Sequence, residues 1–155
     1  MSKRSTIICL SFLTFWVGST AQLPRLHAQQ RDIAVQEVRQ KMENFSGGAV
    51  QITQSAVSGL ATFVAAAPGN PIPTFLSPTA APEERGRKFL DLYGAAFGIT
   101  ALEQVRVQRV HGPDEVGLEH VRFQQVHRGV PVRGGEVIVH LRSAHVTAVT
   151  AKTLP

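Results

Sequence analysis

Cysteine and aromatic residues are scarce in this chain, and each shortage excludes a class of function. The 155 residues contain a single cysteine, Cys9, and a single tryptophan, Trp16, both near the amino terminus. Downstream of residue 9 there is therefore no disulfide framework, no thiolate zinc finger and no cysteine nucleophile. Aromatic residues make up only 6% of the chain, and Lys and Arg form no cluster, so the composition does not indicate nucleic-acid binding.

Recognisable catalytic motifs are missing as well. The sequence has no HExxH zinc segment, no GxSxG nucleophile elbow, no glycine-rich phosphate loop and no internal repeat. Possible carboxylate pairs, Glu115 with Glu119 and Asp114 with Glu136, lack any pattern that would bring them together. We therefore predict that the chain is not an enzyme and holds no metal or cofactor. Five histidines lie in the body of the chain and are interpreted as the polar face of a half-solvated sheet: His111, His120, His127, His140 and His145.

Residues 1–28 have the pattern of a secretory signal peptide. A basic pair precedes an apolar run that ends at Val17, and small residues suit cleavage after Ala21 or after Ala28. The run is shorter than the roughly 20 apolar residues that span a bilayer. We expect a secreted or extracytoplasmic mature chain that is not held in a membrane.

Removal of this segment changes the charge of the protein. The whole chain has a formal net charge of +5, and residues 1–21 include Lys3 and Arg4 but no acid. Cleavage after Ala21 leaves 14 basic and 11 acidic residues, a net charge of +3, and cleavage after Ala28 leaves +2 because Arg25 is also removed. The basic character of the mature chain is therefore modest.

Hydrophobic periodicity and turn residues predict an α+β domain. We expect two helices and an antiparallel sheet built from a hairpin and a meander, with one helix packed across one face. The predicted elements are a helix over 32–45, hairpin strands over 49–53 and 60–66, a surface loop over 67–81, a helix over 82–97, and strands over 105–110, 120–126, 137–141 and 145–151.

Both predicted helices have a distinct apolar face. In the first, Ala34, Val38, Met42 and Phe45 recur at helical spacing. The second begins with Pro82, which suits the first helical position, and its apolar face is Phe89, Leu92, Tyr93, Ala96 and Phe97. Within it, Gly94 is predicted to mark a close approach to the sheet.

The late strands are separated by a segment rich in glycine and proline. Its residues Gly129, Pro131, Gly134 and Gly135 predict a turn or bulge in place of a continuous ladder. Upstream of it, Gln124 and Gln125 break the period-2 alternation, because Val126 lies on the opposite parity to Val121 and Phe123. A β-bulge near the two glutamines would restore the register.

The stretch RFQQVHRGVPVRGGEVIVHL, residues 122–141, resembles the core signature of the fungalysin/thermolysin propeptide (FTP) family. Weaker similarity begins at residues 57–63 and continues through 68–73, 89–99 and 120–125, so that it covers about residues 50–152. The resemblance implies a cystatin-like α+β domain, the amino-terminal propeptide of secreted thermolysin-like zinc metalloproteases. Such a propeptide assists the folding of its own protease and keeps the zymogen inactive.

Two features depart from the family pattern. The last hairpin turn reads Ser143-Ala144-His145, where the family commonly has glycine. In addition, Pro155 stands where a second propeptide half and an HExxH catalytic domain would be expected. The chain is therefore expected to be a propeptide half, and the alternatives are a truncated metallopeptidase precursor or a stand-alone secreted protein-binding module.

The resemblance completes a domain plan and implies a partner. The plan is a signal peptide over 1–28, an amino-terminal helix over 29–48 and an FTP-like domain over 49–155, acting as folding chaperone and inhibitor of a zinc metalloprotease catalytic domain. Turn chemistry alone also accounts for the residue types of the late linker. The candidate partner-contact loop is Val130, Pro131, Val132, Gly134, Gly135 and Glu136.

Overall fold

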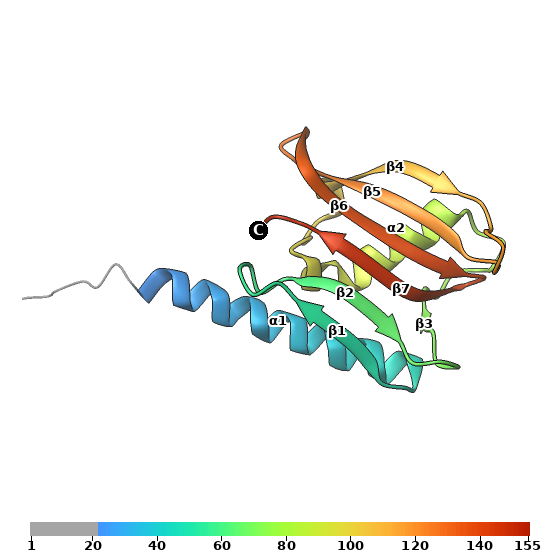
Figure 1. Ribbon diagram of the computed structural model, residues 1–155, viewed down its shortest axis with the longest axis horizontal. Helices are drawn as coiled ribbons and strands as arrows, with labels where there is room; N and C mark the ends of the chain where they lie inside the picture. Colours follow the sequence, from blue (N-terminus) through green and yellow to red (C-terminus); the bar gives the residue numbers. More distant parts are fainter. Residues whose placement is uncertain (1–21) are drawn as a thin grey trace, which may run out of the picture.

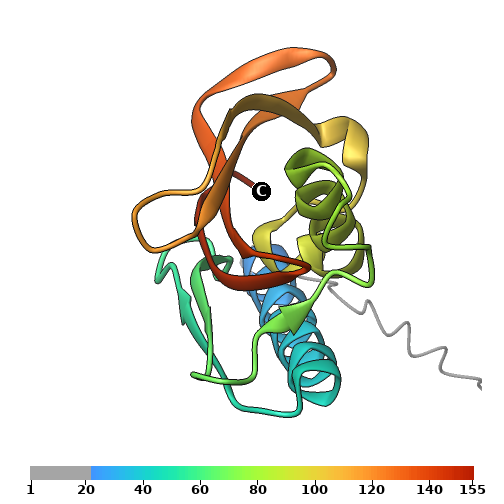
Figure 2. The same cartoon turned by 90° about the vertical axis from the view of Figure 1, so that its right-hand side faces the viewer.

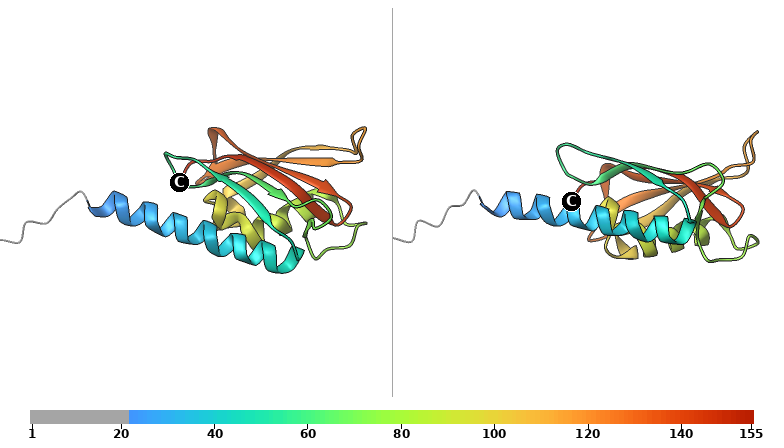
Figure 3. Two further views of the ribbon diagram at one scale, coloured as in Figure 1. Left: turned by 60° about the horizontal axis from the view of Figure 1, so that its bottom comes forward. Right: turned by 90° about the horizontal axis from the view of Figure 1, so that it is seen from below.

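Both helices lie on the same side of a single antiparallel sheet, and the other face of the sheet is left open (Figures 2 and 3). The computed structural model describes residues 22–155, so the first 21 residues of the predicted signal peptide lie outside the described part. The predicted α+β class is confirmed. The elements are α1 (Gln22–Ser46), β1 (Val50–Gln54), β2 (Ala61–Ala66), β3 (Ile72–Pro73), α2 (Pro82–Tyr93), the 3₁₀ turns η1 (Gly94–Phe97) and η2 (Leu102–Gln104), β4 (Val105–His111), β5 (Glu119–His127), β6 (Val130–Arg142) and β7 (His145–Lys152).

The sheet joins the predicted hairpin to the predicted meander. Its strand order is β1-β2-β7-β6-β5-β4, and the short β3 pairs with β7 beside this path (Figure 1). The junction is the pairing of β2 with β7, in which Phe63 lies opposite Thr150 and Ala65 opposite Ala148. The last strand of the chain therefore lies beside the first hairpin, and one core serves both.

Alternation along β5 and β6 places the core between the sheet and the helices. Val121 and Phe123 on β5 are fully buried, as are their register partners Val139 and Val137 on β6. From α2, Phe89 packs in the same apolar cluster with Tyr93, and their ring centroids are 5.1 Å apart. The intervening residues of both strands face away from the helices.

Helix α1 is longer than predicted, and its buried stripe keeps only Val38 and Met42 of the four predicted residues. It begins at Gln22 instead of Asp32, and its buried residues are Val35, Val38 and Met42. Phe45, predicted on the buried face, is 51% exposed, because it lies in the last turn of the helix, which ends at Ser46, and packs edge-on against Phe75 of the β3–α2 loop instead of entering the core. No helix in residues 22–155 is sufficiently long and apolar to cross a membrane.

The close approach of helix to sheet is at Gly86, so the prediction for Gly94 was wrong. A Cβ added at Gly86 would lie 3.0 Å from the ring of Phe123 on β5. A Cβ at Gly94 would instead lie 2.7 Å from the carbonyl oxygen of Ile99, in the segment that follows the helix. Gly94 leaves room for the carbonyl of Ile99, where a Cβ would collide, and the chain continues from Gly94 as the 3₁₀ turn η1. Helix α2 therefore ends at Tyr93, four residues before its predicted end at Phe97.

The predicted loop over residues 67–81 contains one short strand. Ile72 is fully buried and lies opposite Val146, while Pro73 lies opposite His145. Proline is tolerated here because β3 pairs on one side only. The hydroxyl of Thr74 donates to the carbonyl of Ala144 at 2.7 Å, which fixes the end of this strand to the β6–β7 turn.

A buried arginine, not singled out by the sequence, connects α2 to the sheet. Arg85 is 2% exposed, and its Nε donates to the carbonyl of Ala80 at 3.0 Å. Its Nη1 donates to the carbonyl of Ser143 in the β6–β7 turn, and its Nη2 lies 2.6 Å from Glu119 Oε2 at the start of β5. One planar guanidinium thus holds the helix start, a strand start and a turn together.

We predict that Arg85→Lys lowers the free energy of unfolding by about 2–4 kcal/mol. A lysine ammonium is a compact point charge and cannot reach three acceptors that lie around a planar fork. Urea denaturation measures the change. The control is Arg87→Lys on the same helix, which should shift the value by less than about 0.5 kcal/mol; equal losses in the two variants would contradict the role assigned to Arg85.

Candidate functional site

The predicted contact loop forms the tip of the β5–β6 hairpin and the start of β6. Arg128 and Gly129 make a two-residue turn in which both have positive φ, 49° and 81°. This backbone matches the twist of the flanking strands, and it explains the glycine. Val130 then pairs with His127, and Pro131 pairs with Val126.

The predicted bulge lies where the two glutamines break the alternation. The register passes from Gln124 opposite Glu136 to Val126 opposite Pro131, so that residues 132–135 of β6 face Gln125 alone. Gln124 Nε2 donates to the carbonyls of Val132 at 2.7 Å and Gly135 at 2.8 Å. The side chain of Gln124 therefore satisfies backbone groups that the interrupted ladder leaves unpaired.

Gln125, the second glutamine, holds the end of the chain. Its Nε2 donates to the carbonyl of Leu154 at 2.7 Å, and its Oε1 accepts from the Leu154 N–H at 3.0 Å. Gly135 makes room for this side chain, since a Cβ there would lie 2.7 Å from Gln125 Oε1. Gln124 and Gln125 thus have structural roles that their position in the sequence did not reveal.

The six predicted contact residues differ in exposure and fall into three groups. Gly135 is buried beneath Gln125, and Glu136 pairs with Arg122 at 2.7 Å, so both serve the sheet itself. Val132 is half-buried. The remaining three, Val130, Pro131 and Gly134, are exposed, and Val130 is 66% exposed. Arg128 and Arg133, which the prediction left out, are exposed on the same tip.

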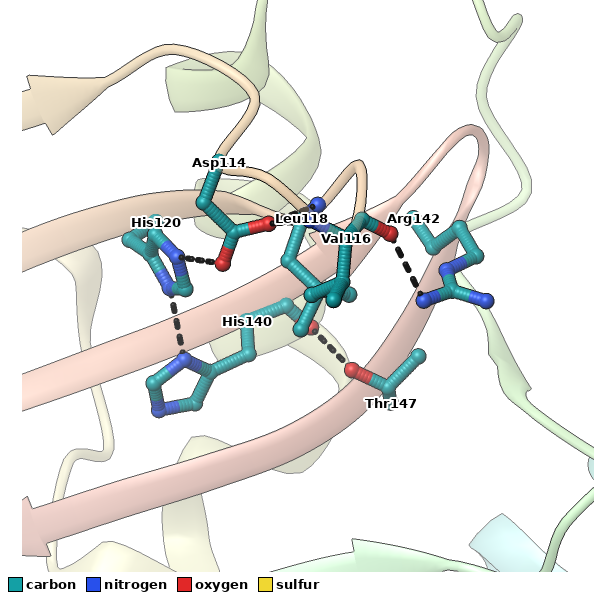
Figure 4. Close-up of polar contacts among 7 residues, drawn as sticks. All are labelled: Asp114, Val116, Leu118, His120, His140, Arg142 and Thr147. Atoms are coloured by element: carbon teal, nitrogen blue, oxygen red, sulfur yellow. Dashed lines mark hydrogen bonds and ion pairs between the residues drawn. The ribbon is translucent and has the colours of Figure 1, made fainter.

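A second candidate site lies on the open face of the sheet, where three of the five predicted histidines form a row. His111 on β4 lies opposite His120 on β5, which lies opposite His140 on β6. His120 Nδ1 is 2.8 Å from His140 Nδ1, and His120 Nε2 is 3.0 Å from Asp114 Oδ2 (Figure 4). His127 and His145 are elsewhere, at the hairpin tip and at the start of β7.

The β4–β5 loop covers one end of this row. Asp114 Oδ1 accepts from the N–H groups of Val116 at 3.0 Å and Leu118 at 2.8 Å, and Arg142 donates to the carbonyl of Val116 at 3.0 Å (Figure 4). These contacts fix the loop over the sheet. They leave an open hollow of about 540 Å³ beside the imidazoles of His120 and His140.

Hydrogen-bond chemistry restricts the protonation of the two imidazoles. The carboxylate of Asp114 only accepts, so His120 Nε2 carries a hydrogen. The two Nδ1 atoms share one hydrogen, and therefore His120 and His140 cannot both be protonated without breaking their contact. Burial and the charge of His120 lower the pKa of His140, against the smaller opposing effect of Asp114. The pKa of Asp114 is also lowered, first by the hydrogen bond from the Leu118 backbone.

The arrangement does not assemble a metal centre in residues 22–155, where no group of three or more His, Cys, Asp or Glu side chains converges on one point. The carboxylates considered as pairs also separate. Glu119 is bound to Arg85, Glu136 to Arg122, and Asp114 to its own loop and His120.

We predict that Gly135→Ala destabilises the fold by about 1–3 kcal/mol, because a methyl group there overlaps both Cβ and Oε1 of Gln125. The amide of Leu154 should exchange with solvent faster, since its acceptor is displaced. Urea denaturation and hydrogen exchange measure the two effects. Gly112→Ala is the matched control, because nothing lies within 4 Å of its added Cβ. Unchanged stability and unchanged Leu154 exchange in Gly135→Ala would contradict the assignment.

We predict that the free energy of unfolding decreases as the pH falls below about 6.5, and that His140→Phe makes this decrease shallower. Because the pKa of His140 is lowered in the folded protein, the unfolded chain binds more protons between its ordinary pKa and the lowered one. The Asp114 contribution is lost only at lower pH, below its ordinary value of 3.8. Urea denaturation from pH 7 to pH 5 tests this, with the exposed His127→Asn as control; parallel profiles for wild type and His140→Phe would refute it.

Comparison with known proteins identifies the carboxy-terminal part of the chain. No curated protein and no solved structure matches the chain significantly. A protein family described as the Fungalysin/Thermolysin Propeptide Motif matches residues 103–152, which span from η2 to the end of β7. The match includes both glutamines, the hairpin tip and the histidine row. The carboxy-terminal meander of this chain is therefore similar to the fungalysin/thermolysin propeptide motif.

Proposed function

We propose that this chain is a secreted propeptide-type domain that assists the folding of a thermolysin-like zinc metalloprotease and inhibits it. The observation that carries the proposal is the match of residues 103–152 to the propeptide motif, which takes in the whole β4–β7 meander. The sequence pattern of residues 1–28 as a signal peptide supports export by the same route as such a protease.

The architecture supports a binding role. Helices α1 and α2 cover one face of the sheet, while the other face and the β5–β6 tip remain available to a partner (Figure 2). A surface that binds a folded or nearly folded catalytic domain stabilises that domain by mass action, which is how a template raises folding yield. The same surface, bound to the mature enzyme, restricts access of substrates.

The β5–β6 tip is proposed as one point of contact with the protease. Val130 is a large apolar side chain that is 66% exposed, and its backbone is fixed by the Arg128–Gly129 turn. A rigid, exposed apolar residue loses little conformational entropy on binding. Gly135 and the two glutamines support this tip from below, through the contacts of the bulge.

We predict that the purified chain, at roughly micromolar concentration, raises the active yield of a denatured thermolysin-like catalytic domain severalfold and slows the mature enzyme. Val130→Asp should weaken both effects, because it places a charge where an apolar contact is proposed. Refolding yield and peptide hydrolysis are the measurements. Val57→Asp is the matched control, since Val57 is 97% exposed on the β1–β2 turn. No effect of the wild-type chain on either measurement would refute the proposed function.

A further inference from the structure

The uncovered face of the sheet has a charge pattern that its buried face lacks. Cross-strand pairing aligns the outward residues into rows that cross several strands. The central row runs from β4 to β1 through Arg109, Arg122, Ile138, Thr150, Phe63 and Thr53. The parallel rows on either side begin with His111 and with Arg106 on the same edge strand.

Basic side chains gather at the β4–β5 end of this face. Arg106 and Arg109 are exposed, and Arg122 is 43% exposed in its side chain. Two acids lie near them, and both are already paired: Glu136 with Arg122 at 2.7 Å, and Asp114 of the β4–β5 loop with His120 at 3.0 Å. Arg106 and Arg109 therefore keep a positive potential on this part of the face, next to the three histidines.

Apolar side chains occupy the middle of the same face. Ile138 on β6 and Phe63 on β2 are separated in the central row only by Thr150, and Phe63 is 37% exposed. In the adjoining row, Ala148 and Ala65 are small and half-buried, so the surface there is level. An apolar centre beside exposed arginines is the composition of protein-binding surfaces.

The β4 edge, beside the exposed arginines, is unsuited to strand addition, which favours the open face as the docking surface at this end of the sheet. Edge strand β4 carries a bulge between Val107 and Arg109 together with its two exposed arginines, and both devices oppose pairing with another strand. At the other edge, the N–H of Val50 is already occupied by Glu43 Oε1 at 3.1 Å.

We infer that this open face docks an acidic surface of a folded protein partner, with Arg106 and Arg109 opposite carboxylates and the Ile138–Phe63 centre against an apolar patch. The exposed arginines at this end of the face favour an acidic partner, and a second copy of this chain is the alternative occupant that the test distinguishes. The inference rests on the proposed function, since the partner is taken to be the protease catalytic domain, and it adds the chemistry of the contact.

Binding kinetics of the full chain to an immobilised thermolysin-like catalytic domain test the inference. The double variant Arg106→Glu/Arg109→Glu should reduce the association rate constant by about tenfold or more and flatten its dependence on salt. The matched control is Arg87→Glu/Lys88→Glu, which makes the same charge change on α2, on the covered side of the sheet. Phe63→Ser should raise the dissociation rate constant, whereas Phe75→Ser, another exposed phenylalanine, should not.

Each outcome of this experiment has a distinct meaning. Wild-type binding with equal losses in the β4 and α2 double variants, or with neither affected, would overturn the inference and leave the proposed function standing. Absence of wild-type binding, together with no effect on refolding yield, would refute the proposed function and the inference with it. Self-association that is lost in Phe63→Ser would assign the face to a second copy and overturn the acidic partner.

Discussion

The strict alternation of buried and outward-facing residues on β5 and β6 is the constraint on which the rest of the structure depends. Val121, Phe123, Val137 and Val139 bring one face of the sheet against α2, and Gly86 allows the helix to approach within contact distance of the Phe123 ring. Because the side-chain period of a strand is two, the same alternation fixes which residues face outward. The core and the open face are therefore two consequences of one pattern.

Where the alternation of buried and outward-facing residues is interrupted, polar side chains form hydrogen bonds with backbone groups that the sheet leaves unpaired. The bulge at Gln125 allows Gln125 and Val126 to be buried in succession, and the two glutamines satisfy the backbone groups that the bulge and the chain end expose. Arg85 has a similar role at the opposite end of the sheet, where it joins the β6–β7 turn to α2. Ser143 in that turn has a φ of 53°, a conformation that favours glycine, so the departure from the family pattern falls on a position with backbone strain.

These contacts distinguish residues that support the interior from exposed residues in the segment that matches the propeptide motif. Gly135 and Gln124 serve the interior of the hairpin, whereas Val130 and Arg133 project from it. The histidine row lies on the open face, where His120 contacts both Asp114 and His140, and within residues 22–155 no group of three or more His, Cys, Asp or Glu side chains converges on one point.

The sequence alone determined the types of the two long helices and of the six longer strands, because period-2 alternation and helical spacing are local properties of a chain. It also located the bulge, since the parity of Val126 conflicts with that of Val121 and Phe123, and it indicated the family through residues 122–141.

Only the tertiary structure decided that β2 lies beside β7, that Val35 replaces Ala34 on the buried stripe of α1, and that Gly86 instead of Gly94 meets the sheet. Arg85 reads as an ordinary surface residue of a helix, and its burial depends on acceptors 34 and 58 residues away in the chain. The local sequence pattern specifies which face of a helix or strand is apolar. Contacts between segments that are distant in the chain depend on tertiary packing. The same packing determines which charged residues lie together on the open face.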